Sequence, residues 1–161
     1  MPNWCFTDYR AVGSKKEIES LFDLLNSLSN MKESLVENGF GSNWLGNIVV
    51  SLGGDWEKLH CRGTFDNVER IGDTVLSFTT ETAWNESQDL RELIEQYYPS
   101  IRMLYMSEEP GQCIYITNDA DGEFFNVWYM VDTENDGRRE FLKYEDVVKE
   151  VERIIGRKLK P

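Results

Sequence analysis

The single histidine of the sequence stands beside a cysteine, as His60-Cys61. Cysteine and histidine form a nucleophilic pair only when their side chains are in contact. Neighbouring residues on a strand point to opposite faces, so we do not expect these two side chains to pair with each other. Cys61 could instead meet a distant partner such as Cys5 across a sheet. We favour the alternative that Cys5, Cys61 and Cys113 are small core residues, because free cysteine is among the most buried residue types.

Two acidic loops resemble fragments of calcium sites, Asp119–Glu123 and Asp132–Gly137. An EF-hand loop ends in a bidentate glutamate. The corresponding position holds Trp128 for the first loop and Lys143 for the second, so neither is an EF-hand. Solvated turns are the plainer interpretation of both loops. A looser cation site remains open, with three weak candidate ligands: Asp132, Glu134 and Asp136.

A pair of glutamates, Glu108-Glu109, precedes Pro110-Gly111. On a strand the two carboxylates face opposite ways and therefore do not share a proton. Glu81 could approach one of them from a neighbouring element. A glycosidase would need two carboxylates held across a groove, and nothing in the sequence indicates a groove. We therefore keep Glu81, Glu108 and Glu109 as candidates for contacts with a partner.

Trp84 stands between a predicted strand and a predicted helix, directly before Asn85. A tryptophan in this position can be a hydrophobic staple that packs against the following helix, and we favour this interpretation. The alternative is a binding anchor, because tryptophan is enriched in binding hot spots. Trp84 is therefore a fourth candidate for partner contacts.

Hydrophobic spacing and turn signals predict the elements that position these residues. A helix begins at the capping box of Ser14 and Glu17 and continues to about Leu28. A second helix begins at a capping box of Asn85 and Gln88 and covers 86–98. The segment 44–52 has helical spacing with Asn43 as its cap, and a buried strand over 48–52 is the alternative. The remaining predicted elements are a short helix at 31–37, strands at 3–12, 59–70, 74–81, 101–107, 112–117 and 123–132, a polar loop at 133–138, a short edge strand at 140–142 and a final helix at 145–155.

This order of elements predicts an α+β fold in one domain, residues 1–161. The series β-α-β-β-α-β within it matches a ferredoxin-like plan, in which helices cover mainly one face of an antiparallel sheet. We expect the extra strands to extend that sheet and the last helix to follow them.

The chain of 161 residues has 29 Asp and Glu against 17 Lys and Arg, a formal net charge of −12. Nucleic-acid-binding proteins neutralise phosphates with basic residues, so we expect no direct binding to nucleic acids. Anionic membranes are disfavoured for the same reason. The acids concentrate in 66–95 and 107–140. The negative electrostatic potential of these acids attracts cations and basic protein surfaces. A role in solubility alone is the plainer interpretation of the charge.

The cysteines indicate a reducing compartment. They are three in number, widely spaced and without a C-x-x-C motif, which argues against a disulfide scaffold or a zinc ribbon. Residues 1–10 do not have the pattern of a signal peptide, and no apolar run approaches the ~20 residues of a membrane span. We expect a cytoplasmic protein. The nucleotide-binding and hydrolase motifs are missing from the sequence, so we expect no cofactor and no enzyme.

Three segments resemble one known family. The opening Met1-Pro2-Asn3-Trp4-Cys5, the segment Thr82-Ala83-Trp84, and Tyr97-Tyr98-Pro99 followed by Glu108-Glu109-Pro110-Gly111 are similar to YubB-like proteins of plasmids, phages and conjugative elements. Thr7 and Asn85-Glu86-Ser87 depart from the usual pattern of that family, and 31–59 does not align with it. The resemblance implies a ferredoxin-like fold and a mobile-element origin, and it implies no particular activity.

Three hypotheses about function follow. The first is a non-enzymatic module that binds a protein partner through a sheet face or an acidic rim. The second is an inhibitor whose acids mimic the phosphates of a nucleic acid, which requires them to be spaced along one surface. The third is an enzyme or cation-binding protein that uses His60, Cys61 or the acidic loops. The oligomeric state stays open.

Overall fold

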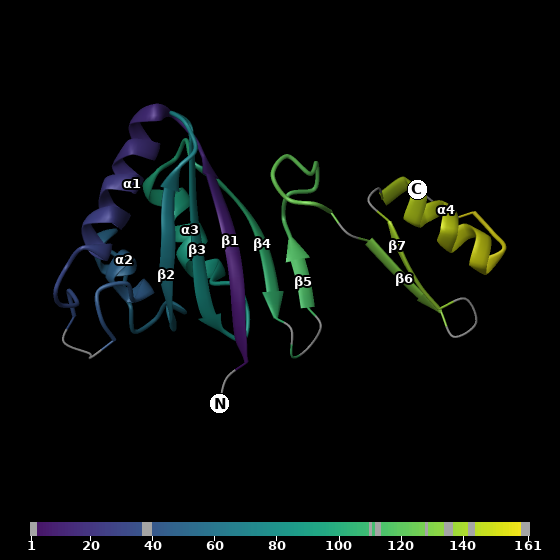
Figure 1. Cartoon of the computed structure of the whole chain (residues 1–161), viewed down its shortest axis with the longest axis horizontal. Coiled ribbons are helices and arrows are strands. Elements are labelled where there is room, and N and C mark those ends of the chain that lie inside the picture. Colours follow the sequence, from purple (N-terminus) through teal and green to yellow (C-terminus); the bar gives the residue numbers. More distant parts are fainter. Residues whose placement is uncertain are drawn as a thin grey trace. The chain divides into compact units, whose positions relative to one another are not determined.

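The computed structural model describes residues 3–36, 40–109, 111, 114–127, 129–133, 137–141 and 144–158. The chain forms two compact units, Met1–Asn118 and Asp119–Pro161. The first unit contains a five-stranded sheet and three helices, and the second contains a two-stranded sheet and one helix (Figure 1). The α+β class predicted from the sequence is confirmed.

The sheet of the first unit has the strand order β2-β3-β1-β4-β5, and each strand is antiparallel to its neighbours. Two connections between its strands contain helices: α1 and α2 lie between β1 and β2, and α3 lies between β3 and β4. The elements are β1 (Trp4–Val12), α1 (Lys15–Ser29), α2 (Leu45–Ser51), β2 (Gly63–Arg70), β3 (Val75–Ala83), α3 (Gln88–Tyr97), β4 (Arg102–Glu109) and β5 (Ile114–Thr117).

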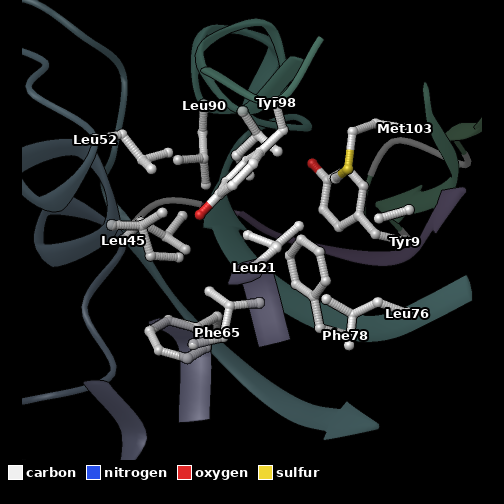
Figure 2. Packing of buried hydrophobic residues seen from close by; sticks show 14 of the residues in the cluster. Tyr9, Leu21, Leu45, Leu52, Phe65, Leu76, Phe78, Leu90, Tyr98 and Met103 are labelled. Atoms are coloured by element: carbon white, nitrogen blue, oxygen red, sulfur yellow. The ribbon is translucent and has the colours of Figure 1, made fainter. Parts of the chain in front are cut away.

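One face of this sheet is covered and forms the core. Alternate residues of the central strands are buried, as the period of two in a strand requires. On β1 and β3 these include Tyr9 and Phe78, whose rings stack with centroids 4.9 Å apart. Leu21 of α1, Leu45 of α2 and Leu90 of α3 lie in the same cluster as these rings (Figure 2). Full burial of each such side chain stabilises the fold by about 1.5–3 kcal/mol.

The first helix begins where the sequence predicts it. The Ser14 side chain accepts a hydrogen bond from the Glu17 amide, which confirms the cap. Glu17 makes a different contact from the expected one, however. Its carboxylate accepts hydrogen bonds from the amide and the hydroxyl of Ser100, at 2.9 and 2.6 Å. The start of α1 is therefore tied to the turn before β4.

The segment between α1 and β2 agrees with its prediction only in part. Residues 31–36 are not helical, so the short helix predicted at 31–37 is wrong for these residues. The helical prediction for 44–52 is confirmed by the short helix α2, Leu45–Ser51, and the alternative of a buried strand is wrong. The residue at the N-cap of α2 is Trp44 rather than Asn43, and its side chain makes no capping hydrogen bond.

The helix α3 starts later than predicted. Its N-cap is Ser87, not Asn85, and the helix covers Gln88–Tyr97. The Ser87 hydroxyl donates to the carbonyl oxygen of His60 instead of capping its own helix. This hydroxyl holds the chain before β2 against the start of α3, a contact between residues distant in sequence that local patterns do not encode.

The second unit contains β6 (Tyr129–Thr133), β7 (Gly137–Phe141) and α4 (Tyr144–Ile155). The predicted strand at 123–132 is wrong for 123–127, which have no regular structure. The buried Asp119 carboxylate accepts hydrogen bonds from the amides of Glu123, Phe124 and Phe125, so it holds these residues in a turn. The last two strands pair with each other in a separate sheet, so the expectation that all extra strands extend the main sheet is correct for β5 only.

Candidate functional site

The face of the main sheet opposite the helices carries a row of acidic and aromatic residues. The register pairs Glu81 with Phe6 and with Thr64, and it pairs Glu108 with Phe6 and with Tyr115. One side chain from each of the five strands therefore stands in a line. Phe6 is 52% exposed and Tyr115 is 36% exposed, and Glu108 is exposed as well. We call this line, Thr64-Glu81-Phe6-Glu108-Tyr115, the open-face row.

A shallow hollow of about 330 Å³ lies along this row. Among the described residues, its lining includes no basic side chain and four carboxylates, those of Asp8, Asp66, Glu81 and Glu108. Asp8 and Asp66 belong to the next row of the sheet, where both are paired with Thr79. Acids from four strands, β1 to β4, thus share one depression with the ring of Phe6.

Strand alternation and one glycine position these side chains. On β1 the buried Cys5 and Thr7 point to the helices, so Phe6 and Asp8 point away from them. At the start of β2, a Cβ atom on Gly63 would lie 2.2 Å from the carbonyl oxygen of Glu81. A side chain has no room there, so Gly63 permits the close approach of β2 to β3 beside Glu81.

The positive charge of Arg10 lies further along the same face. It is two residues beyond Asp8 on β1, and its guanidinium donates to the Tyr9 carbonyl and to the Ser77 hydroxyl, at 2.9 and 2.8 Å. These contacts hold Arg10 along the sheet. In the part of the chain that the structure describes, the charged residues that line the hollow are all acidic.

The four residues predicted for partner contacts divide between different surroundings. Glu81 and Glu108 stand in the open-face row, two strands apart and therefore roughly 10 Å from each other along the sheet. Glu109 is buried on the other face, where its carboxylate accepts a hydrogen bond from the Gly111 amide at 2.8 Å. The opposite orientation predicted for the two glutamates is confirmed.

Trp84 follows the end of β3 and is 49% exposed. Its backbone has a φ of 77°, which is rare for a residue with a side chain, and its amide donates to the carbonyl oxygen of Asn3. Asn85 does not cap α3, so the predicted position of a staple before this cap is wrong. The exposed indole lies beside a second, smaller hollow of about 210 Å³, which Cys5 and Ser107 also line.

The predicted cysteine chemistry finds little support in the geometry. Cys5 and Cys61 are free and buried, as expected for core residues, and Cys113 lies outside the described residues. The Cys5 sulfur lies 2.9 Å from the Ser107 hydroxyl, and the Cys61 thiol donates to the Trp56 carbonyl. Burial, followed by the charge of Asp89, raises the pKa of Cys61, which disfavours the nucleophilic thiolate.

Among the described residues, the carboxylates of the two acidic loops are not arranged as metal ligands. Glu134 and Asp136 lie outside the described residues, and Asp132 lies on β6. The Asp119 carboxylate is occupied by three backbone amides. Within the described part of the chain, no group of three or more His, Cys, Asp or Glu side chains is arranged to hold a metal ion.

Sequence reasoning missed Phe6, Tyr115, Asp8 and Asp66 as parts of the site. A signal for two of them exists in the opening strand, where Trp4, Phe6 and Asp8 alternate with buried positions. Large aromatic side chains on the exposed face of a strand are typical of a contact surface. Their alignment with Glu81 and Glu108 depends on the register between strands, which the sequence does not state.

Comparisons of the chain with models of known protein families, with curated proteins and with solved structures find no match. No helix of the described residues is long and apolar enough to cross a bilayer. The function of the chain must therefore follow from its own geometry.

Proposed function

We propose that the chain is a non-enzymatic protein-binding module that holds a basic segment of a partner protein on the open face of its main sheet. The observation that carries this proposal is the open-face row, in which Glu81 and Glu108 flank the exposed ring of Phe6. The acids of the hollow attract lysine and arginine, and the aromatic rings supply apolar area and faces for cations.

We expect the free energy of binding to be the sum of many weak contacts. An exposed ion pair contributes only about 0.2–1 kcal/mol, so the two glutamates alone do not give tight binding. Burial of the Phe6 and Tyr115 rings against the aliphatic stems of lysine and arginine would add apolar area. The net charge of −12 would also speed the encounter with a basic partner at low salt. Affinity that falls as salt rises is therefore expected.

We also propose that the first unit has a ferredoxin-like core. The strand order β2-β3-β1-β4, with helices in both crossing connections, supports this plan. A mobile-element origin is proposed from the resemblance of the three short segments. The pairing of Trp4 with Ala83 and the hydrogen bond from Trp84 to Asn3 support treating two of these segments as one structural feature. A cytoplasmic setting is proposed as well, and the two free cysteines support it.

The geometry gives less support to the other two hypotheses, a charge-mimic inhibitor and an enzyme or cation-binding protein. Exposed acids also occur on the helices, for example Glu19 and Asp23 of α1, so the negative charge is not confined to one phosphate-like line. A charge mimic is therefore not favoured by a specific observation. The raised pKa of Cys61 likewise gives no support to a reactive thiol.

The experiment is a binding titration with a fluorescent lysine-rich peptide and the full chain, at low and at physiological salt. The double variant Glu81→Gln/Glu108→Gln should weaken binding about tenfold, from the loss of two ion pairs. The matched control is Asp23→Asn/Glu33→Gln, which removes the same charge from two exposed positions outside the sheet. Equal weakening by both double variants would show that net charge alone attracts the peptide, and the proposal would be wrong.

A further inference from the structure

A further depression, larger than the two hollows described above, lies at the edge of β2. Its volume is about 770 Å³, within the range of about 300–1,000 Å³ that is typical of ligand sites. Four aromatic side chains from three separate segments line it: Trp4, Phe40, Trp44 and Trp56. We call this depression the aromatic cleft.

The rings of the cleft contact one another, and two of them are largely exposed. Phe40 stacks on Trp44 with centroids 5.5 Å apart, and Trp44 meets Trp56 edge to face at 5.4 Å. Trp44 is only 4% exposed, whereas Phe40 is 62% exposed and Trp4 is 42% exposed. Rings so exposed around a buried indole leave apolar area in contact with water, and a further apolar group could cover it.

The cleft is built by specific contacts. The buried Asn47 amide donates to the carbonyls of Gly41 and Ser42, and its oxygen accepts from the Ser34 hydroxyl and the Leu35 amide. These four bonds tie residues 34–35 and 41–42 to Asn47 of α2. An isolated bridge between Trp44 and Thr64 then fastens this segment to β2. The site is therefore formed by buried polar contacts as well as by apolar collapse.

The polar groups in the cleft are few and of mixed charge. Arg62 and Glu81 bring one positive and one negative charge to its lining, together with His60 and Cys61. The Cys61 thiol is held by the Trp56 carbonyl, and burial raises its pKa. Because the lining surface is mainly apolar and the charges of Arg62 and Glu81 are of opposite sign, the cleft is suited to apolar groups rather than to a strongly charged ligand.

The cleft is continuous with the acidic hollow. Thr64 and Glu81 line both depressions, so a bound segment that contacts Glu81 from the hollow would reach the cleft with its next side chains. A second copy of this chain is a poor occupant, because two chains of net charge −12 repel each other. A segment with both basic and bulky apolar side chains could bind the acidic hollow with the former and the aromatic cleft with the latter.

We propose that the aromatic cleft binds bulky apolar side chains, such as tryptophan or leucine, of the same basic partner segment that the open-face row holds. This inference rests on the proposed function, because it assigns to one partner both the lysines or arginines and the apolar anchor. Buried aromatic anchors dominate the binding energy of many interfaces. The cleft then supplies most of the affinity, and the acidic row supplies orientation and salt dependence.

The experiment uses the full chain and two synthetic peptides of equal length and equal lysine content. One peptide carries two tryptophans next to its lysines, and the other carries serines in their place. Fluorescence anisotropy of a label on each peptide gives the Kd. The peptide with tryptophans should bind at least about tenfold more tightly. Phe40→Ser should remove most of that difference, and Tyr97→Ser, which changes a similarly exposed ring on α3, should not.

The outcomes separate the two proposals. If the two peptides bind equally and only Glu81→Gln/Glu108→Gln weakens them, the cleft inference is wrong and the proposed function stands. A different result is that the tryptophan peptide binds more tightly, and that its affinity falls with Phe40→Ser but not with Glu81→Gln/Glu108→Gln. That result would support apolar binding in the cleft, and the proposal that the open-face row holds the segment would be wrong. Binding of neither peptide would overturn both. Thermal unfolding of each variant must match that of the parent chain, and an exposed Phe40 makes this the expected result.

Discussion

Tyr9 connects the buried core to a charged pair at the start of α3. Its ring is fully buried against Phe78, and its hydroxyl donates to the Glu86 carboxylate at 2.9 Å. The same carboxylate oxygen accepts from Arg91 at 3.0 Å. Burial, with an added contribution from Glu86, raises the pKa of Tyr9 well above its ordinary value of 10.0. This tyrosine therefore stays neutral in the folded chain over a range in which it ionises in the unfolded chain.

The pH dependence follows from that difference. Above pH about 10 the unfolded chain holds fewer protons at this position than the folded chain, so the free energy of unfolding falls as pH rises. Tyr9→Phe should lower the free energy of unfolding by about 1 kcal/mol at neutral pH through the lost hydrogen bond. The gap between the variant and the parent should then shrink as pH rises above about 10, because only the parent loses stability through Tyr9.

Urea unfolding at neutral pH and at alkaline pH measures both effects. Tyr98 and Tyr105 also have raised pKa values, mainly through burial, so both proteins retain some loss of stability at high pH. If the difference in free energy of unfolding between the parent chain and Tyr9→Phe is the same at both pH values, the buried environment assigned to Tyr9 is contradicted.

At the scale of the elements, local patterns predicted those parts that local forces decide. The helix after Ser14 has its cap and its apolar spacing in sequence, and the hairpin of β2 and β3 has its turn at 71–73. The start of α3 was misplaced because Ser87 binds the distant His60 carbonyl rather than its own helix. The segment 123–127 was misassigned because buried Asp119 holds its amides in a turn, whereas its aromatic composition favours a strand.

The helix α2 offers a direct test of the cleft's construction. In an ordinary helix interior, Gly→Ala stabilises by about 1 kcal/mol. At Gly46 a Cβ atom would lie 2.2 Å from the ring of Trp44, so the ring or the helix must move. Gly46→Ala should therefore destabilise the chain by about 1–3 kcal/mol despite its higher helix propensity.

The measurement is chemical unfolding monitored by tryptophan fluorescence. Ser51→Ala in the same helix is the control, and it should change stability by less than about 0.5 kcal/mol. An increase in stability on Gly46→Ala would mean that Trp44 does not lie over this glycine.

At the scale of the whole molecule, the sequence identified site residues but not their arrangement. Glu81 and Glu108 are 27 positions apart in the chain and share a row only because β1 lies between β3 and β4. Phe6 stands between them through that same pairing. Glu109, the neighbour of Glu108, is buried by strand alternation and does not belong to the exposed surface. The register between distant strands decides which residues belong to the site, and local sequence patterns do not show which distant strands are neighbours.

The aromatic cleft likewise depends on contacts between separate segments of the chain. Its rings come from the start of β1, from the segment before α2 and from the loop after α2, and the hydrogen bonds of Asn47 help to bring them together. The sequence showed five tryptophans and a capped segment at 44–52, but it did not indicate which rings face one another. The buried Asn47 amide and the bridge between Trp44 and Thr64 therefore form a part of the site that the spacing of residues in the sequence does not reveal.

Binding of a basic protein segment to the open sheet face can be followed residue by residue by NMR titration of the isotope-labelled full chain with the lysine- and tryptophan-bearing peptide. The largest changes in amide shifts should fall on the strands of the open-face row, at Phe6, Glu81 and Glu108, and extend to Thr64. Changes confined to the helices α1 and α3, or no changes at peptide concentrations up to the millimolar range, would contradict binding at this face.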